Sequence, residues 1–252
     1  MKKFLLIYTI TGILHGGWII KFEEKAKDEK PETMKVYISK GMIVSEKKKE
    51  VFIFDFTKEI IRIIDHDEKS YFEGKLDEYI SFYEKMERDV KGEIEERMKE
   101  IPPEYREIME KMIKPEVNIN IRKLDKKEKI LGYNTEVYEI ETETKGTMFS
   151  MKTRTESYIS PDLKFVPSEI RKEDAERISK KFEKIKDEYG FSNMISKIEE
   201  GFVLKSILYN EEGKEIYRTQ AISINKGEIP SSLIEIPKGY EKEELKDILM
   251  EK

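Results

Sequence analysis

One short motif combines residue types that bind metal ions or transfer protons. Asp65, His66 and Asp67 are consecutive and follow an apolar run. In an extended strand the two aspartates point to one side and the histidine to the other, so the three cannot converge on one metal ion. A polar turn that ends a strand explains the same residues. We therefore predict a turn at this motif and no metal site.

The composition argues against most catalytic chemistry. The chain has no cysteine and only two histidines, His15 and His66. This removes disulfides, thiolate zinc sites and cysteine nucleophiles, and it leaves little basis for a histidine-centred triad. No phosphate-binding glycine loop, Gly-x-Ser-x-Gly elbow or His-Glu-x-x-His helix occurs. We expect no enzyme activity, no catalytic residues and no cofactor.

Carboxylates are abundant, and they keep one catalytic alternative open. They lie mainly with lysines on the polar faces of the predicted helices, which is typical of a solvated surface. A hydrolase would need two carboxyl groups that converge in a cleft and have raised pKa values.

Aromatic side chains point instead to a binding surface. Phe52, Phe54 and Phe56 occupy alternate positions and therefore share one face of a strand. By the same parity we place Trp18, Ile20, Phe22, Met42 and Val44 on that face. A concave sheet lined in this way could accept an acyl chain or an apolar peptide. The predicted lining consists of Trp18, Phe22, Phe52, Phe54, Phe56, Tyr79, Tyr83 and Phe149.

A second interpretation of these aromatic residues is an ordinary core. The predicted helices carry apolar stripes that must be buried somewhere, and they could fill the concave space themselves. Tyr79, Tyr83, Met86, Tyr189 and Met194 would then form a lid over the sheet. Opening of that lid would decide between a ligand site and a filled core.

The charge balance bears on the partners. Charged residues make up 40% of the 252 residues, and 48 basic side chains face 53 acidic ones for a net charge of −5. Basic and acidic residues in nearly equal numbers give no indication of a nucleic-acid-binding surface. The many Lys, Glu and Ile residues resemble the composition of proteins from hot-living organisms.

The N-terminus predicts export. Lys2 and Lys3 precede an apolar stretch from Phe4 to Leu14, which is the pattern of a signal peptide. We expect residues 1–17 to be the signal, with cleavage near Gly16 or Gly17, and residues 18–252 to form a single domain. A first strand of a cytosolic protein is the alternative.

The periodicity predicts an α+β fold with a mostly antiparallel sheet. About six short strands joined by polar turns span residues 18–73. Further strands are predicted at about 117–121, 135–142, 146–160, 202–209 and 215–224, the last two joined by the turn Asn210–Gly213. Helices are predicted from Leu76 to Met98, then to about Lys114, over 173–199 and over 241–251.

Four stretches, in this order, resemble an uncharacterised bacterial family, a domain of unknown function related to the LolA-type outer-membrane lipoprotein carriers. They are Asp65–Tyr71, Leu131-Gly132-Tyr133 with Val137-Tyr138, Tyr158–Leu163 and Ser232–Tyr240. Tyr158 departs from the tryptophan, and Ile234 from the phenylalanine, that relatives tend to have there.

The resemblance implies an unclosed antiparallel half-barrel with amphipathic helices on its concave face. It implies an exported, periplasmic or outer-envelope protein without catalytic residues. The expected partner is a hydrophobic ligand: a lipid, a lipoprotein acyl chain or an apolar segment. The alternative is a ligand-free scaffold or sensor that acts through contacts with another envelope protein. The cargo and the oligomeric state stay open.

Overall fold

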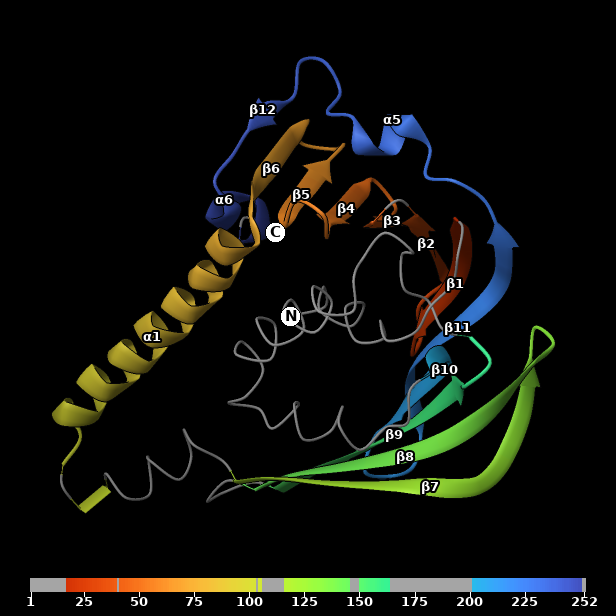
Figure 1. Cartoon of the computed structure of the whole chain (residues 1–252). Helices are drawn as coiled ribbons and strands as arrows, with labels where there is room; N and C mark the ends of the chain where they lie inside the picture. Colours follow the sequence, from red (N-terminus) through yellow and green to blue (C-terminus); the bar gives the residue numbers. More distant parts are fainter. Residues whose placement is uncertain are drawn as a thin grey trace.

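All the described strands belong to one sheet. The computed structural model describes residues 17–39, 41–102, 104–105, 116–145, 150–163 and 201–250. Within them, twelve strands form a single sheet in the order β12-β6-β5-β4-β3-β2-β1-β11-β10-β9-β8-β7. The sheet curves strongly and its two ends do not meet (Figure 1). The predicted α+β half-barrel is confirmed.

The strands and helices have the following bounds. The first half of the sheet comprises β1 (Trp18–Ala26), β2 (Glu32–Ser39), β3 (Met42–Lys47), β4 (Glu50–Asp55), β5 (Ile60–Asp65) and β6 (Ser70–Lys75). The second half comprises β7 (Glu116–Ile130), β8 (Tyr133–Lys145), β9 (Ser150–Ser160), β10 (Phe202–Tyr209) and β11 (Glu215–Lys226). The remaining elements are α1 (Leu76–Glu100), α5 (Ser231–Ile234), β12 (Glu241–Lys242) and α6 (Leu245–Met250).

The predicted six-stranded meander is confirmed in β1–β6, where each strand pairs antiparallel with the next. The Asp65-His66-Asp67 motif forms the predicted turn between β5 and β6. Asp65 Oδ1 accepts hydrogen bonds from the backbone N–H groups of Asp67 at 2.8 Å and Glu68 at 3.0 Å. A short polar side chain thus satisfies the turn's backbone donors, as such residues commonly do.

The predicted β10–β11 hairpin is also confirmed, with Gly213 at a φ of +72° in its turn. Its place in the sheet is unexpected. β11 pairs with β1, so this hairpin lies at the centre of the sheet and joins its two halves.

The helix α1 matches the prediction, but only its first turns pack against the sheet. The backbone N–H of Lys75 donates to Glu78 Oε2 at 3.2 Å and stabilises the start of the helix. Leu76, Tyr79 and Ile80 are buried, whereas Met86 is 37% exposed. Beyond these turns the helix diverges from the sheet (Figure 1). No helix in the described ranges is both long enough and apolar enough to cross a membrane.

Several expectations concern parts of the chain outside the described residues. These are the signal peptide, except for its last position Gly17, most of the short helix to Lys114, and the helix over 173–199. The predicted helix over 241–251 is partly wrong. Glu241 and Lys242 pair parallel with Ser70 and Tyr71 of β6, and the helix α6 begins only at Leu245.

A segment that we call the strap, residues 227–240, connects β11 to β12 across the outer face of the sheet (Figure 1). Ile229, Leu233, Ile234 and Tyr240 of the strap pack against buried residues of β2–β5. After β12 the chain turns inward, since Leu245 and Ile248 of α6 belong to the main core. The C-terminal segment therefore wraps around the β6 edge of the sheet.

Candidate functional site

Apolar residues form continuous rows across the concave face of β1–β6. Paired residues of adjacent strands share a face, so the strand register defines each row. One row consists of Trp18, Ile38, Ile43, Phe54 and Ile61. The next consists of Ile20, Val36, Ser45, Phe52, Ile63 and Phe72. These rows carry one polar residue, Ser45, and no charged one, so the face is apolar across six strands.

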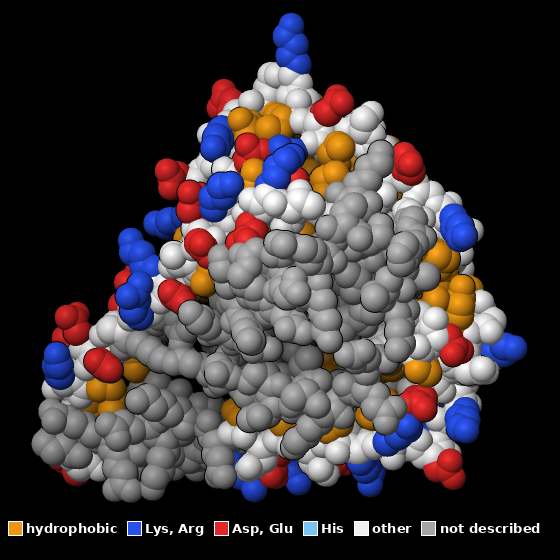
Figure 2. All heavy atoms as spheres, in the orientation of Figure 1, with side chains coloured by type: hydrophobic (Ala, Val, Ile, Leu, Met, Phe, Trp, Pro, Cys, Tyr) orange, Lys and Arg blue, Asp and Glu red, His pale blue; other side chains and the backbone are white. Residues whose placement is uncertain are grey.

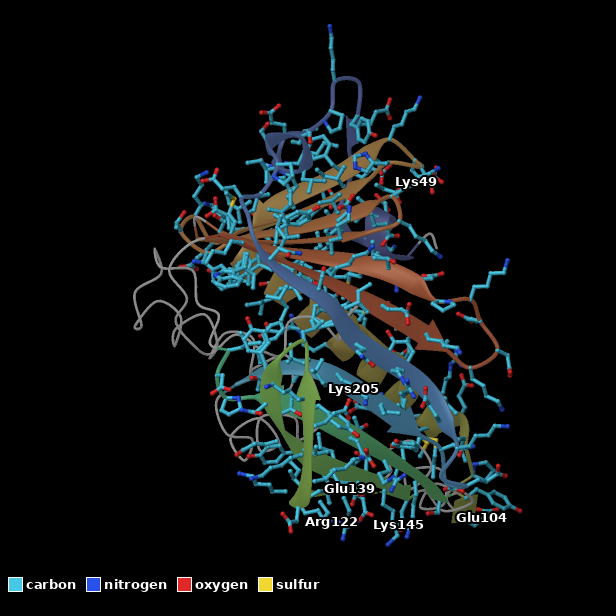
Figure 3. All side chains as sticks on the ribbon, turned by 90° about the vertical axis from the view of Figure 1, so that its right-hand side faces the viewer. Lys49, Glu104, Arg122, Glu139, Lys145 and Lys205 are labelled. Carbon is cyan, nitrogen blue, oxygen red and sulfur yellow. The ribbon has the colours of Figure 1, made fainter. Side chains whose placement is uncertain are left out.

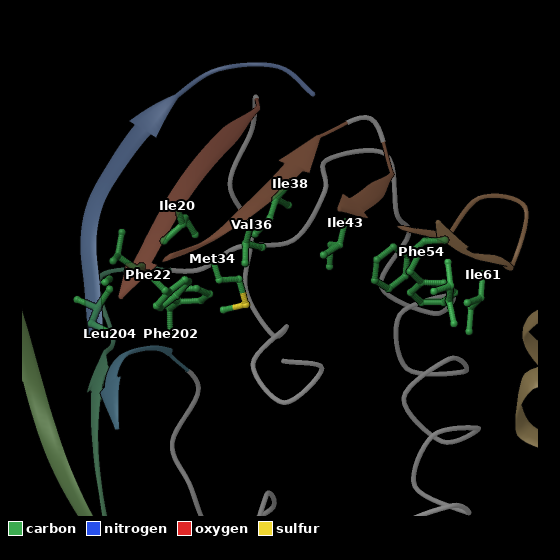
Figure 4. Packing of buried hydrophobic residues seen from close by; sticks show 14 of the residues in the cluster. Ile20, Phe22, Met34, Val36, Ile38, Ile43, Phe54, Ile61, Phe202 and Leu204 are labelled. Carbon is green, nitrogen blue, oxygen red and sulfur yellow. The ribbon is translucent and has the colours of Figure 1, made fainter. Parts of the chain in front are cut away.

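The second half of the sheet extends this surface. Phe202 of β10 lies with its ring centroid 6.2 Å from that of Phe22 on β1. Phe202, Leu204 and Ala221 belong to the same buried cluster as the two rows. In Figure 4 the labelled side chains of the cluster point to the inside of the curved sheet. The apolar lining therefore passes across the β1–β11 pairing.

Aromatic rings gather at the end of β4 and on the first turns of α1. The ring centroids of Phe54 and Phe56 are 4.2 Å apart, and those of Tyr79 and Tyr83 are 5.0 Å apart. The Tyr79 hydroxyl donates a hydrogen bond to that of Tyr83 at 3.5 Å. Burial raises the pKa of both phenols above the ordinary value of 10.0. Both phenol groups therefore stay neutral. This suits a role in an apolar surface better than a role as a catalytic base.

Seven of the eight predicted lining residues lie in or against one cluster. Phe22, Phe54, Phe56 and Tyr79 are buried members of it, and Trp18, Phe52 and Tyr83 pack against it half-buried. Phe149 lies outside the described residues.

The inward placement of Met42 and Val44 is wrong. Val44 belongs to the buried cluster on the outer face, and Ile43 takes the inner position opposite Ile38 and Phe54. The tight turn at Gly41 sets this register, and a shift of one residue exchanges the two faces of a strand.

The apolar rows end at a charged border. The third row begins with Phe22 and Met34 and continues with Lys47, Glu50 and Asp65. Lys47 Nζ forms an ion pair with Glu24, whose carboxylate is nearly buried, and lies 3.8 Å from Glu32 Oε2. On the face shown in Figure 2, basic and acidic side chains are likewise mixed around the described periphery. The charged side chains thus lie outside the two apolar rows and do not interrupt them.

The strap covers the outer face and was missed by sequence reasoning. Arg62 contacts both Glu73 of β6 and the carbonyl oxygen of Ile234 in the strap. His66 Nδ1 lies 2.8 Å from the Tyr240 hydroxyl, which ties the β5–β6 turn to the end of the strap. The sequence signals in this segment were a few apolar residues in a stretch broken by prolines and the family resemblance of Ser232–Tyr240, and neither predicted that the segment packs on the sheet.

A small cavity lies between the strap and β3–β5. Its volume is about 230 Å³, and it is lined by Met42, Ile53, Asp55, Lys58, Ile60, Arg62, Ile234 and Glu235. Ligand pockets usually measure roughly 300–1,000 Å³, so this cavity is small for a lipid. Its main polar groups are already engaged, because Asp55 accepts hydrogen bonds from Thr57 and Lys58.

The second half of the sheet holds two buried carboxylates, and both have cationic partners. Glu139 is 2% exposed and contacts Arg122 at 2.5 Å and Arg154 at 3.5 Å. Arg122 and Glu139 lie side by side near the lower end of the sheet in Figure 3. Glu139 is thus neutralised by two arginines, which is typical of a structural ion pair.

Glu156 is the second of these carboxylates. It accepts hydrogen bonds from Lys126 Nζ and the Tyr158 hydroxyl, both at 2.9 Å. Burial opposes ionisation of Glu156, but these hydrogen bonds outweigh it and lower the pKa of the carboxyl group. A general acid requires the opposite shift. Among the described residues, no group of three or more His, Cys, Asp and Glu could hold a metal ion.

The chain is similar to several solved structures at low sequence identity. An uncharacterized conserved protein from Thermus thermophilus is 8% identical over 90% of this chain and 89% of its own, with a TM-score of 0.43. The Pseudomonas aeruginosa MucA/MucB complex contains a chain that is 11% identical over 86% of this chain and 54% of that one, with a TM-score of 0.37. A LolA superfamily protein from Nitrosomonas europaea is 8% identical over 89% of this chain and 92% of its own, with a TM-score of 0.25.

No curated protein matches the sequence significantly. A family match, in contrast, covers more than half of the chain. Residues 93–240 match the family described as Domain of unknown function (DUF4412). This range contains three of the four stretches that predicted the resemblance and ends at Tyr240, the last residue of the strap. The chain therefore belongs to the DUF4412 family.

Proposed function

We propose that this protein is a non-catalytic envelope protein that binds a hydrophobic ligand on the concave face of its half-barrel. The ligand is a lipid, a lipoprotein acyl chain or an apolar segment. The observation that carries the proposal is the pair of apolar rows across β1–β6, which contain no charged residue. Six adjacent strands at about 4.8 Å spacing give a surface about 24 Å wide, which suits an extended chain better than a compact ligand.

The burial of the concave face determines which contacts a ligand must replace. Phe54 is 5% exposed and Tyr79 is 4% exposed. A ligand on this face therefore replaces contacts within the protein rather than contacts with water. Each buried CH₂ group of an acyl chain contributes about 0.8 kcal/mol, so ten such groups contribute about 8 kcal/mol. Only long chains can compete, and affinity should rise about fourfold per added CH₂ group.

We place the protein in the periplasm or outer envelope, with residues 1–17 as a signal peptide and residues 18–252 as one domain. The basic start and the apolar stretch after it support export. A receiving or delivering partner in the envelope accompanies a carrier of this kind. No cofactor, metal or nucleic acid takes part in the proposed function.

The second candidate is a scaffold or sensor that acts through protein contacts and carries no ligand. The low exposure of Phe54 and Tyr79 favours it, because the concave face is already covered. The two candidates differ in whether an acyl chain can displace that cover.

The experiment combines lipid analysis with a matched pair of variants. Lipids that co-purify with the exported protein are identified by mass spectrometry, and fatty acids of increasing length are titrated while the fluorescence of Trp18 is followed. Phe52→Ala removes a half-buried ring from the inner face, and Tyr71→Ala removes one from the outer face.

A ligand site predicts bound acyl species, affinity that rises with chain length, and loss of affinity in Phe52→Ala alone. A ligand at 100 times its Kd should also stabilise the fold by about 2.7 kcal/mol. Protein that carries no lipid and gives no response at any chain length would favour the scaffold. Equal losses in the two variants would place binding elsewhere.

A further inference from the structure

The turn between β7 and β8 carries an unusual residue for its conformation. Ile130 pairs with Tyr133, so only Leu131 and Gly132 connect the two strands. Both have positive φ, +51° for Leu131 and +89° for Gly132. These angles are those of a type I′ turn, which favours asparagine or aspartate at the first position and glycine at the second. Leucine at the first position therefore opposes the local preference of the turn.

Leu131 also differs from the other residues that adopt this conformation. Among the described residues other than glycine, those with positive φ are Asp28, Lys48, Glu59, Lys69 and Leu131. The first four are charged, and Leu131 alone is apolar. It is 43% exposed, so the fold gains little packing from it. A residue that breaks a local rule without such a gain indicates a role in binding.

The turn projects from the molecule. In Figure 1 it lies at the right-hand edge of the molecule, where β7 and β8 meet. A Cβ atom added to Gly132 would meet no atom within 4 Å in the part of the chain that the structure describes. Ile130, directly before the turn, is buried and fixes the base of the hairpin in the fold. Leu131 is thus an apolar side chain on a supported, projecting tip.

Positive charge lies next to this tip. Lys127 and Lys129 are exposed and have no ion-pair partner among the described residues. Glu128 between them instead accepts hydrogen bonds from Lys205 at 2.9 and 3.0 Å. Lys129 is two residues from Leu131, about 7 Å along the strand, which is within the Debye length of about 8 Å at physiological salt. The tip is therefore locally basic, although the chain has a net charge of −5.

We propose that the β7–β8 turn docks this protein on an anionic lipid surface. Leu131 inserts between the headgroups, and Lys127 and Lys129 lie at the lipid phosphates. Burial of an apolar side chain and attraction of lysine to anionic lipids are both favourable at such a surface. Leu131 lies outside the apolar rows of the concave face, so this contact does not depend on whether that face carries a ligand.

The small size of the tip sets the strength of the contact. Membrane binding through a single apolar anchor is marginal and reversible, and basic residues strengthen it. Each lysine near an anionic surface contributes about fivefold to the affinity. We therefore expect weak, reversible binding to vesicles that contain phosphatidylglycerol. Binding should fall with rising salt and should be much weaker on pure phosphatidylcholine.

Vesicle flotation of the exported protein tests the apolar part of the contact. Leu131→Asn should lower the affinity for phosphatidylglycerol vesicles about fivefold, because the inserted side chain is lost. Asn-Gly is the favoured sequence of a type I′ turn, so this variant should fold at least as stably as the wild type. Met86→Gln is the matched control. Met86 is 37% exposed on the helix α1, glutamine is a good helix former, and vesicle binding should not change.

Charge reversal tests the basic part of the contact. Lys129→Glu should lower the affinity at least about tenfold, because an attraction is replaced by a repulsion. Lys69→Glu makes the same charge change at the β5–β6 turn, where Lys69 also has a positive φ. It should leave the affinity nearly unchanged, since charges beyond a Debye length are largely screened.

A fluorescent label locates the inserted residue, since the chain contains no cysteine of its own. Leu131→Cys carries a polarity-sensitive dye, and its emission should shift to shorter wavelengths when phosphatidylglycerol vesicles are added. The same dye on Lys69→Cys is the control and should keep its emission.

Three results would overturn the proposal. A wild-type protein that does not bind phosphatidylglycerol vesicles would leave the tip for a protein partner. Equal binding of Leu131→Asn and the wild type would show that no apolar insertion occurs. An unchanged dye at position 131 in vesicle-bound protein would place the membrane contact elsewhere.

Discussion

Replacement of Phe54 by alanine tests how tightly the concave face is packed. The ring is 5% exposed, lies opposite Ile43 and Ile61 in the strand register, and has its centroid 4.2 Å from that of Phe56. Phe-to-Ala changes in packed cores cost about 3–5 kcal/mol, because apolar contacts are lost and a cavity remains. We expect a loss of about 4 kcal/mol, which includes the contribution of the aromatic pair.

Equilibrium unfolding in urea measures this loss directly. Trp18 is the only tryptophan and packs against the same cluster as Phe54, so its fluorescence reports on this region. With a slope of about 2–3 kcal/mol/M, the midpoint should fall by roughly 1.5 M urea. Tyr105→Ala is the control, because Tyr105 is 56% exposed and should change stability by at most about 0.5 kcal/mol.

A loss below about 1 kcal/mol for Phe54→Ala would refute the packing described for the inner rows. It would mean that the rows do not form a close-packed surface. The proposal of an acyl-chain site on that surface would then lose its basis.

Three further predictions concern the strap, acid stability and backbone conformation. Arg62→Ala removes the contact to the Ile234 carbonyl, so amide hydrogen exchange in residues 229–240 should accelerate; unchanged exchange would contradict the role of Arg62. Burial opposes ionisation of Asp55, but hydrogen bonds from the following turn outweigh it and lower the pKa of this carboxyl below 3.8. The contribution of ionised Asp55 to the free energy of unfolding is therefore complete above that pH and is lost as the pH falls through the folded-state pKa. The Asp55→Asn variant should be less stable than the wild type at pH 7 but not in strong acid. A stability difference that stays constant with pH would disprove this. Gly92→Ala in the helix α1 should raise the melting temperature, with a gain of about 0.5–1 kcal/mol, whereas Gly213→Ala should lower it because its φ is +72°; equal signs would refute the assignment.

The sequence predicted those parts of the fold that depend on local pattern. Alternation within one strand is sufficient to place Phe52, Phe54 and Phe56 on one face, because parity is fixed inside a strand. Parity is not fixed across a turn, and this is why Val44 was assigned to the inner face while Ile43 occupies it. A turn one residue longer or shorter would have reversed the outcome.

The features that the sequence did not reveal depend on contacts between distant residues. Pro230 and Pro237 interrupt any period in the strap, so its apolar residues looked like parts of a loop. The pairing of Glu241 with Ser70 cannot be read from either segment alone. The ion pairs of Glu139 were also hidden, because carboxylates are too common in this sequence for any one to stand out.

The position of β11 next to β1 has a consequence for how the chain folds. Apart from this pairing and that of β12 with β6, every strand pairing in the described sheet joins two strands that are consecutive in the chain. Trp18 pairs with Lys226, so the central seam joins segments about 200 residues apart. Closing so long a loop costs entropy before any contact offsets it, and such contacts slow folding. The strand β1 therefore keeps one edge unpaired until β11, which lies near the C-terminal end of the chain, pairs with it.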